Sequence, residues 1–160
     1  MIKWIKLYKN TWFGIFILGI VFILIQEIPY FIMPFIKLKS NPLMDMIATH
    51  SVLEILEKSL GISTIVSMVF IIDTNQKWFS LSSKKEKTLF FTSIALLFGY
   101  YIGWVFYFNG YQSLSLVLTL LVALPPLYYI TLGLWRNNYI TAILGILFFF
   151  AHLANVWTSY

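Results

Sequence analysis

The sequence has no cysteine and few charged residues. Its 160 residues include six acidic side chains, and charged residues make up 11% of the chain, against about 25% in an ordinary soluble domain. The absence of cysteine excludes disulfide scaffolds, thiolate metal sites and cysteine nucleophiles. The low charge, together with 60% apolar and 19% aromatic residues and a mean hydropathy of +0.84, excludes a soluble enzyme, a nucleic-acid-binding domain and a disordered tail.

What the sequence does contain is apolar residues in the quantity that membrane spans require. The apolar fraction of 60% corresponds to about 96 residues, close to the roughly 100 that five bilayer-spanning helices need. We therefore expect an all-α integral membrane helix bundle that forms a single domain over residues 1–160. Its five transmembrane helices are expected at residues 12–36, 48–72, 88–108, 114–135 and 139–157.

The second of these spans is the least regular. Only residues 62–72 are free of charge, and that is too short to cross about 30 Å of hydrocarbon. The helix must therefore begin well upstream and carry Glu54, Glu57 and Lys58 with it. Whether residues 44–58 are embedded in the membrane or lie at its interface stays open at this stage.

The positions of the basic residues predict an orientation. Cytoplasmic loops of membrane proteins carry an excess of Lys and Arg. In the five-span topology, segments on one side hold eight basic residues and those on the other at most three, which places the N-terminus inside and the C-terminus outside. Ten of the eleven basic residues are lysine, and Ile, Phe and Asn are abundant, which indicates a bacterial cell membrane. The eight are Lys3, Lys6, Lys9, Lys77, Lys84, Lys85, Lys87 and Arg136; the three are Lys37, Lys39 and Lys58.

Two consecutive prolines, Pro125 and Pro126, fall inside the fourth span. Proline has no backbone N–H, so the pair removes two helix donors and frees upstream carbonyls. We expect a kink here, and a kink in a small bundle often opens a pocket between helices.

Glu27 is the sharpest functional signal in the sequence. A carboxylate well inside a bilayer segment costs roughly 2.5–3.5 kcal/mol on insertion scales, so it usually faces a partner or a water-filled cavity. Gln26 beside it adds a hydrogen-bonding group. The alternative is that the membrane segment ends at Gln26 and that Glu27 meets the lipid headgroups.

His50, Glu54 and Glu57 are spaced so that a helix places them on one face. A carboxylate four residues from an imidazole can fix its tautomer and raise its basicity, as an acid/base pair requires. The alternative is a surface-lying first turn in which Glu54 pairs with Lys58.

Further polar and aromatic residues are expected near the same outer end. His152 and Asn155, three residues apart, either bind a ligand or hydrogen-bond a neighbouring helix. Tyr101 and Trp104 share a helix face and either line an apolar cavity or pack in the core and the aromatic belts. No compact metal signature is present, so we expect neither a metal nor another cofactor.

Several short motifs are similar to those of EXPERA-domain membrane proteins, which include a sterol isomerase, the emopamil-binding protein. The resemblance covers roughly residues 12–136, and this chain departs from the four-span family core by having a fifth span. It implies that His50 and Glu54 resemble the proton-moving pair of the isomerase and Glu27 an acidic residue of its ligand cavity. The motifs are Gln26-Glu27-Ile28-Pro29-Tyr30, the His50-x-x-x-Glu54 pair, Lys77-Trp78 and Pro125-Pro126-Leu127-Tyr128-Tyr129.

Three functions remain open. The first is a protein that binds or carries a lipophilic or amphiphilic small molecule in a pocket near the extracytoplasmic side. The second is an intramembrane lipid-modifying enzyme that uses a His/Glu pair, and the third is an accessory or immunity-type partner of another membrane protein. We expect membrane lipids as partners and no nucleic acid. The candidate residues are His50 and Glu54 for catalysis, and Gln26, Glu27, Glu57, Tyr101, Trp104, His152 and Asn155 for ligand binding.

Overall fold

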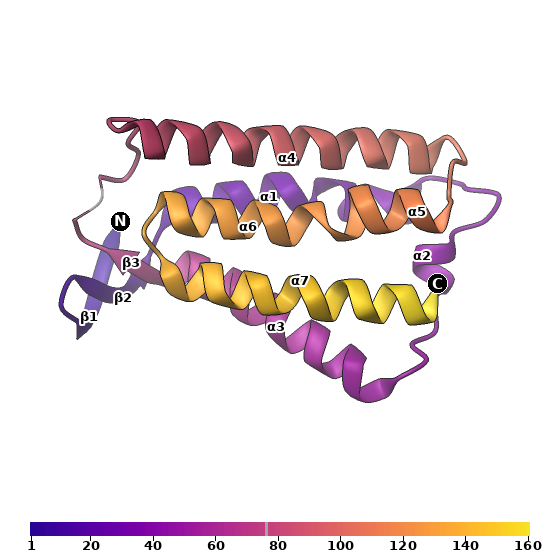
Figure 1. The fold of residues 1–160 in the computed structure, drawn as a ribbon, viewed down its shortest axis with the longest axis horizontal. Helices are drawn as coiled ribbons and strands as arrows, with labels where there is room; N and C mark the ends of the chain where they lie inside the picture. The colour runs from indigo at the N-terminus through magenta and orange to yellow at the C-terminus, as the bar shows by residue number, and fades with distance from the viewer. Residues whose placement is uncertain (76) are drawn as a thin grey trace.

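A computed structural model describes residues 1–75 and 77–160 as a mostly helical protein with a small sheet at one end (Figure 1). The N-terminus lies at the sheet end and the C-terminus at the opposite end. In chain order the elements are β1 (Ile2–Tyr8), β2 (Thr11–Ile15), α1 (Ile17–Ile32), a 3-10 turn (Met33–Phe35), α2 (Pro42–Asp45), α3 (Ser51–Phe70), β3 (Ile71–Asp73), α4 (Lys84–Phe108), α5 (Leu114–Leu116), a π-helical turn (Val117–Val122), α6 (Leu124–Trp135) and α7 (Tyr139–Ser159).

Within the described residues, four helical segments are long and apolar enough to cross a membrane. Large apolar side chains such as Phe98, Val105 and Phe150 are exposed on the outer faces of these segments, as expected where lipid is the solvent. The protein is thus a multi-pass membrane protein. The four segments are Ile17–Phe35, Lys84–Phe108, Leu114–Trp135 and Tyr139–Ser159.

The helix α3 is not among these four, although the sequence predicted a span, the least regular of the five, at residues 48–72. It is 20 residues long, which is enough for a crossing. However, it carries Glu54, Glu57 and Lys58 in its first half. In Figure 1 the start of α3 diverges from the other helices, and its end rejoins them beside α7.

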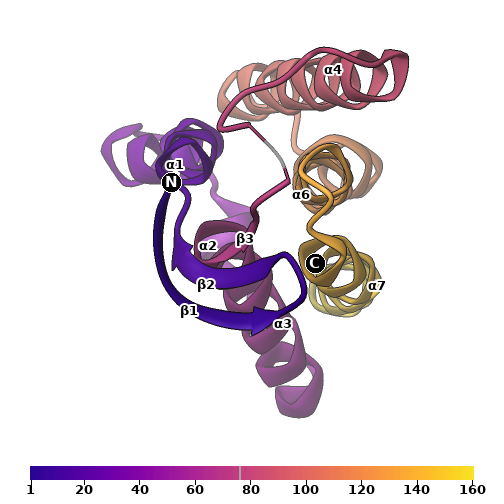
Figure 2. The ribbon, with the colours of Figure 1, turned by 90° about the vertical axis from the view of Figure 1, so that its left-hand side faces the viewer.

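The three-stranded sheet corrects the prediction of an all-helical fold. Residues 12–15, assigned to the first span, belong to β2, and α1 begins only at Ile17. Strands β1 and β2 form an antiparallel hairpin, and β2 also pairs with β3 in the order β1-β2-β3 (Figure 2). Gly14 is required in this hairpin, because a Cβ there would lie 2.1 Å from the carbonyl oxygen of Ile2.

The helix α4 begins four residues before the predicted span at 88–108. Ser83 caps it by accepting a hydrogen bond from the backbone N–H of Glu86, and the Glu86 carboxylate accepts one from the backbone N–H of Ser83 in return. This capping box satisfies two helix-end donors. It explains why a polar turn precedes the apolar part of the helix.

The predicted break at Pro125 and Pro126 coincides with a change of helix type. The π-helical turn at Val117–Val122 directly precedes these prolines. There, the backbone N–H of Ala123 donates to the carbonyl of Leu118 over 3.0 Å. Because neither proline can donate, the wider turn accommodates the missing bonds.

Tyrosines from α4 and α6 hold α1 in the bundle. The hydroxyl of Tyr128 donates to the carbonyl of Phe22 over 3.2 Å, and that of Tyr101 donates to the carbonyl of Ile25. Trp104 and Tyr107 of α4 are buried in the aromatic core beside Tyr100. The hydroxyls of Tyr128 and Tyr101 therefore bind between helices, as is typical of helix packing in membranes.

Candidate functional site

A cavity of about 230 Å³ lies between α1, α3, α6 and α7. We call it the inter-helix cavity. It exists because α3 packs mainly against α7 and only lightly against α1, so the space between α1 and α3 is not filled by side chains. Its lining combines aromatic rings with polar and ionisable groups: Gln26, Glu27, Tyr30, Gly61, Ile65, Pro125, Tyr129, Phe148 and His152.

Glu27 lines this cavity from α1 and is partly buried. Among the residues that the structure describes, no hydrogen bond or ion pair to the Glu27 carboxylate is found. A carboxylate placed in a membrane helix is stabilised by a partner or by water. Its location in the cavity, between helices, favours the cavity interpretation over a contact with the headgroups alone.

Gln26 is almost fully buried, at 2% exposed, and is already engaged. Its Nε2 donates to the hydroxyl of Tyr100 over 3.2 Å, and its Oε1 accepts a hydrogen bond from the hydroxyl of Tyr129. The side chain thus links α1 to α4 and α6. Gln26 borders the cavity, but its amide nitrogen and oxygen already bind Tyr100 and Tyr129 within the protein.

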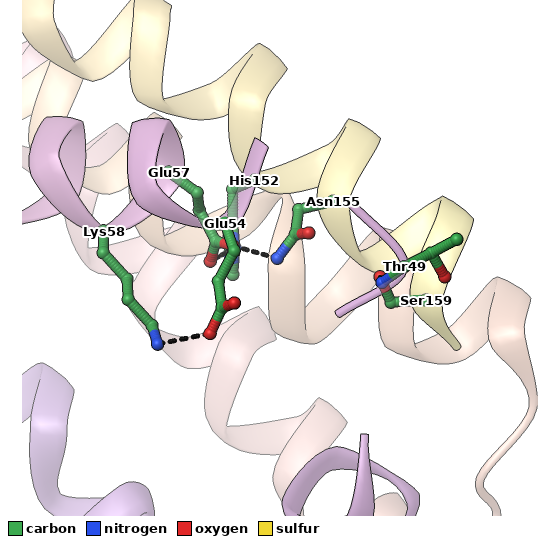
Figure 3. A network of polar contacts seen from close by, with 7 residues as sticks. All are labelled: Thr49, Glu54, Glu57, Lys58, His152, Asn155 and Ser159. Carbon is green, nitrogen blue, oxygen red and sulfur yellow. Dashed lines mark hydrogen bonds and ion pairs between the residues drawn. The ribbon is translucent and has the colours of Figure 1, made fainter. Parts of the chain in front are cut away.

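A second polar group lies beside the cavity, where α3 meets α7 (Figure 3). The Nδ1 atom of His152 lies 2.7 Å from Oε1 of Glu57, and Nδ2 of Asn155 donates to the other oxygen of the same carboxylate. The ring of His152 stacks on Phe148, with centroids 5.0 Å apart. Three of the residues that the sequence singled out therefore form one network across two helices.

The contact with Glu57 orients the imidazole of His152. An ionised carboxylate only accepts hydrogen bonds, so with Glu57 ionised the donor in this bond is Nδ1 of His152. In the neutral ring, Nε2 is then an acceptor. Since His152 also lines the cavity, the arrangement can exchange a proton with a molecule bound there.

The structure does not bring His50 and Glu54 together as an acid/base pair. His50 is exposed and directly precedes the first residue of α3. Glu54 forms an ion pair with Lys58, as in the alternative interpretation of this segment. Figure 3 shows the Glu54–Lys58 ion pair and, as a separate set of contacts, those of Glu57 with His152 and Asn155.

Tyr101 and Trp104 also lie away from the cavity. Tyr101 donates to the backbone of α1. Trp104 is 1% exposed. Its ring centroid lies 5.1 Å from that of Tyr30, which lines the cavity. Of these two residues, Trp104 is part of the core that supports the cavity wall.

Six residues of the lining were not among the candidate site residues: Tyr30, Gly61, Ile65, Pro125, Tyr129 and Phe148. Tyr30 and Tyr129 fall inside motifs that were quoted for other reasons. Gly61 allows close contact, since a Cβ there would lie 3.1 Å from the ring of Phe148. No local pattern identifies Phe148, because it reaches the site only through the packing of α7 on α3.

A second hollow on the protein is less suited to recognising a specific ligand. A larger apolar groove of about 820 Å³ runs between α7 and the segment from α5 to α6, with Leu118, Phe150 and Trp157 in its wall. It has no ionisable side chain, and in a bilayer lipid chains fill such a groove.

Throughout the described part of the chain, no cluster of three or more His, Cys, Asp or Glu side chains is placed to hold a metal.

Comparison with known proteins finds no relative. No family model, no curated protein sequence and no solved structure matches this chain. The resemblance to the EXPERA domain stays a prediction from short motifs.

Proposed function

We propose that this protein crosses the membrane five times, with its N-terminus in the cytoplasm, and binds a lipophilic or amphiphilic small molecule in the inter-helix cavity. The cavity lies toward the extracytoplasmic side in this orientation. The observation that carries the proposal is Glu27, an intramembrane carboxylate that lines a cavity between helices.

The sheet supports five crossings in spite of the charges on α3. Strand β2 leads into α1, strand β3 follows α3, and the two strands pair. The start of α1 and the end of α3 therefore lie at the same end of the molecule. Because α1 has carried the chain to the other end, α3 must return it across the same distance.

The charges of the loops support the orientation. All eight basic residues assigned above to the cytoplasmic side fall in the N-terminal hairpin, in the β3–α4 connection and first turn of α4, or between α6 and α7. These segments share the sheet end of the bundle (Figure 1). An excess of Lys and Arg marks the cytoplasmic end.

The size and lining of the cavity indicate the kind of ligand. Sites for whole drug-sized molecules measure roughly 300–1,000 Å³, so a cavity of about 230 Å³ suits the polar end of an amphiphile whose chain extends into lipid. Glu27 favours a head group with a positive charge or a hydrogen-bond donor. The rings of Tyr30 and Tyr129 line the cavity and offer apolar faces to such a group.

The test is ligand-dependent thermal stabilisation of the purified protein in detergent. Dodecylamine should raise the melting temperature more than dodecanol, which has the same chain and no charge. Glu27→Gln should remove that difference, and Glu54→Gln should keep it, because Glu54 pairs with Lys58 outside the cavity. Equal stabilisation by both probes, or an unchanged difference in Glu27→Gln, would contradict the proposal.

A second candidate, an intramembrane enzyme that moves a proton on a lipid substrate, is favoured by the contact between His152 and Glu57. This proton-moving pair, His152 and Glu57, differs from His50 and Glu54, the pair that the EXPERA resemblance implied. His152→Ala should abolish turnover of bound lipid and leave amphiphile binding at Glu27 in place, whereas His50→Ala should leave both unchanged. Loss of turnover in His50→Ala would instead favour the pair from the resemblance.

A further inference from the structure

Arg136 occupies an unusual position at the sheet end, far from the inter-helix cavity. It directly follows α6 and is 6% exposed. Burial lowers the pKa of the Arg136 guanidinium to about 10, which leaves it charged at neutral pH. A buried charge usually has a partner of opposite sign. Among the described residues, no carboxylate lies within ion-pair distance of it.

The contacts of Arg136 are with backbone, sulfur and aromatic rings. One Nη atom donates to the carbonyl of Lys77, and the other lies 3.5 Å from the sulfur of Met1. The guanidinium carbon lies 4.6 Å from the ring centroid of Phe16 and 5.4 Å from that of Trp135. These contacts orient the group, while Asp73 and Glu86 attract its positive charge from beyond ion-pair distance.

An apolar pocket of about 290 Å³ lies beside two residues that contact this guanidinium. Met1 and Phe16, both in contact with Arg136, form part of its wall, and Val21 and Trp78 form another part. Trp78 is 65% exposed, as is common for tryptophan at a membrane interface. A positive group thus lies behind the Met1 and Phe16 wall of a pocket that suits a hydrocarbon chain.

The surroundings of the pocket have the charge that an anion requires. The sheet end holds eight of the eleven basic residues and two of the six acidic ones, Asp73 and Glu86. Both acids are engaged locally: Asp73 accepts from the backbone N–H of Asn75, and Glu86 is part of the cap of α4. Basic pockets at the cytoplasmic ends of membrane helices are suited to anionic lipid headgroups.

We propose that Arg136 and this pocket bind one anionic phospholipid of the cytoplasmic leaflet, with its phosphate at the guanidinium and the start of one acyl chain against Phe16 and Val21. Arginine is suited to this role because its planar fork matches phosphate geometry. The site is separate from the inter-helix cavity, and it does not depend on the function proposed there.

The experiment measures thermal unfolding of the full chain in detergent with added phosphatidylglycerol, phosphatidylcholine or inorganic phosphate. Phosphatidylglycerol should raise the melting temperature more than phosphatidylcholine, and native mass spectrometry should show one retained phosphatidylglycerol. Arg136→Gln should lose the shift that is specific to phosphatidylglycerol. Lys39→Gln, at the opposite end of the bundle, should keep it.

Val21→Trp provides a second variant that leaves the charge in place. Val21 is 42% exposed, so a larger side chain there fills the pocket without disturbing the core. It should also lose the specific shift, which keeps the test valid if Arg136→Gln fails to fold. Equal shifts with the two lipids, equal protection by inorganic phosphate, or an unchanged specific shift in Val21→Trp would overturn the proposal.

Discussion

Nδ1 of His152 lies 2.7 Å from Oε1 of Glu57, and this contact joins α7 to α3, which carries three charged residues in its first half. Asn155 donates to the second oxygen of the same carboxylate. Both partners come from α7, so the position of α3 depends on α7 more than on any other helix.

Glu57→Ala should therefore destabilise the protein by about 1–2 kcal/mol, because it leaves two side chains of α7 without their acceptor. Thermal unfolding in detergent measures this as a lower melting temperature. Glu54→Ala is the matched control on the same helix and should change it little, since exposed ion pairs contribute little. Equal loss in both variants would show that the network does not hold α3.

Gln26→Leu should lower stability by about 2 kcal/mol, because the buried hydroxyls of Tyr100 and Tyr129 lose their partner. The triple variant with Tyr100→Phe and Tyr129→Phe should recover most of this loss, since it removes the unsatisfied groups as well. Chemical or thermal unfolding of the three proteins measures both effects. If the triple variant is less stable than Gln26→Leu alone, the loss arises from packing and not from unpaired hydroxyls.

The absence of cysteine makes the topology directly testable, because every introduced thiol is unique. Lys84→Cys should react with an impermeant maleimide only from the cytoplasmic side, and Tyr160→Cys only from the other. Ile47→Cys, in the connection before α3, should behave like Tyr160→Cys if α3 crosses the membrane. Labelling of Ile47→Cys and Lys84→Cys from the same side would show that α3 does not cross.

Gly14→Ala should separate β1 from β2, because the new Cβ would lie 2.1 Å from the carbonyl oxygen of Ile2. Hydrogen exchange of residues 2–15 should rise at least about tenfold, which corresponds to about 1.4 kcal/mol of lost local stability. Helix content by circular dichroism should stay constant. Leu7→Ala, at an exposed position of the partner strand β1, is the control and should leave hydrogen exchange in the hairpin unchanged.

The helices were predictable from the sequence because apolar length is a local property. Four of the five predicted spans correspond to long apolar helices. Pro125 and Pro126 marked the fourth predicted span, which contains the π-helical turn. The sheet was not predictable in the same way, since β2 pairs with β3 across more than fifty residues of chain. The apolar run from Trp12 onward continues through both strand and helix, so composition gave no sign of the boundary at Phe16.

The candidate site was predicted in part for the same reason. Glu27 and His152 stood out because ionisable residues are unusual in apolar segments, and both line the cavity. The pairing of Glu57 with His152 instead of Glu54 with His50 depends on how α3 and α7 meet. That packing follows from contacts between residues 95 positions apart, which no spacing rule in one helix describes.

The dependence of α3 on α7 has a consequence for biogenesis. The ribosome completes Glu57 long before His152 and Asn155 exist, so the nascent chain must hold a charged helix at the translocon or at the membrane surface until the last segment arrives. A nonsense mutation upstream of α7 would leave α3 without His152 and Asn155, the residues that bind Glu57. Cellular quality control is expected to degrade the shortened product.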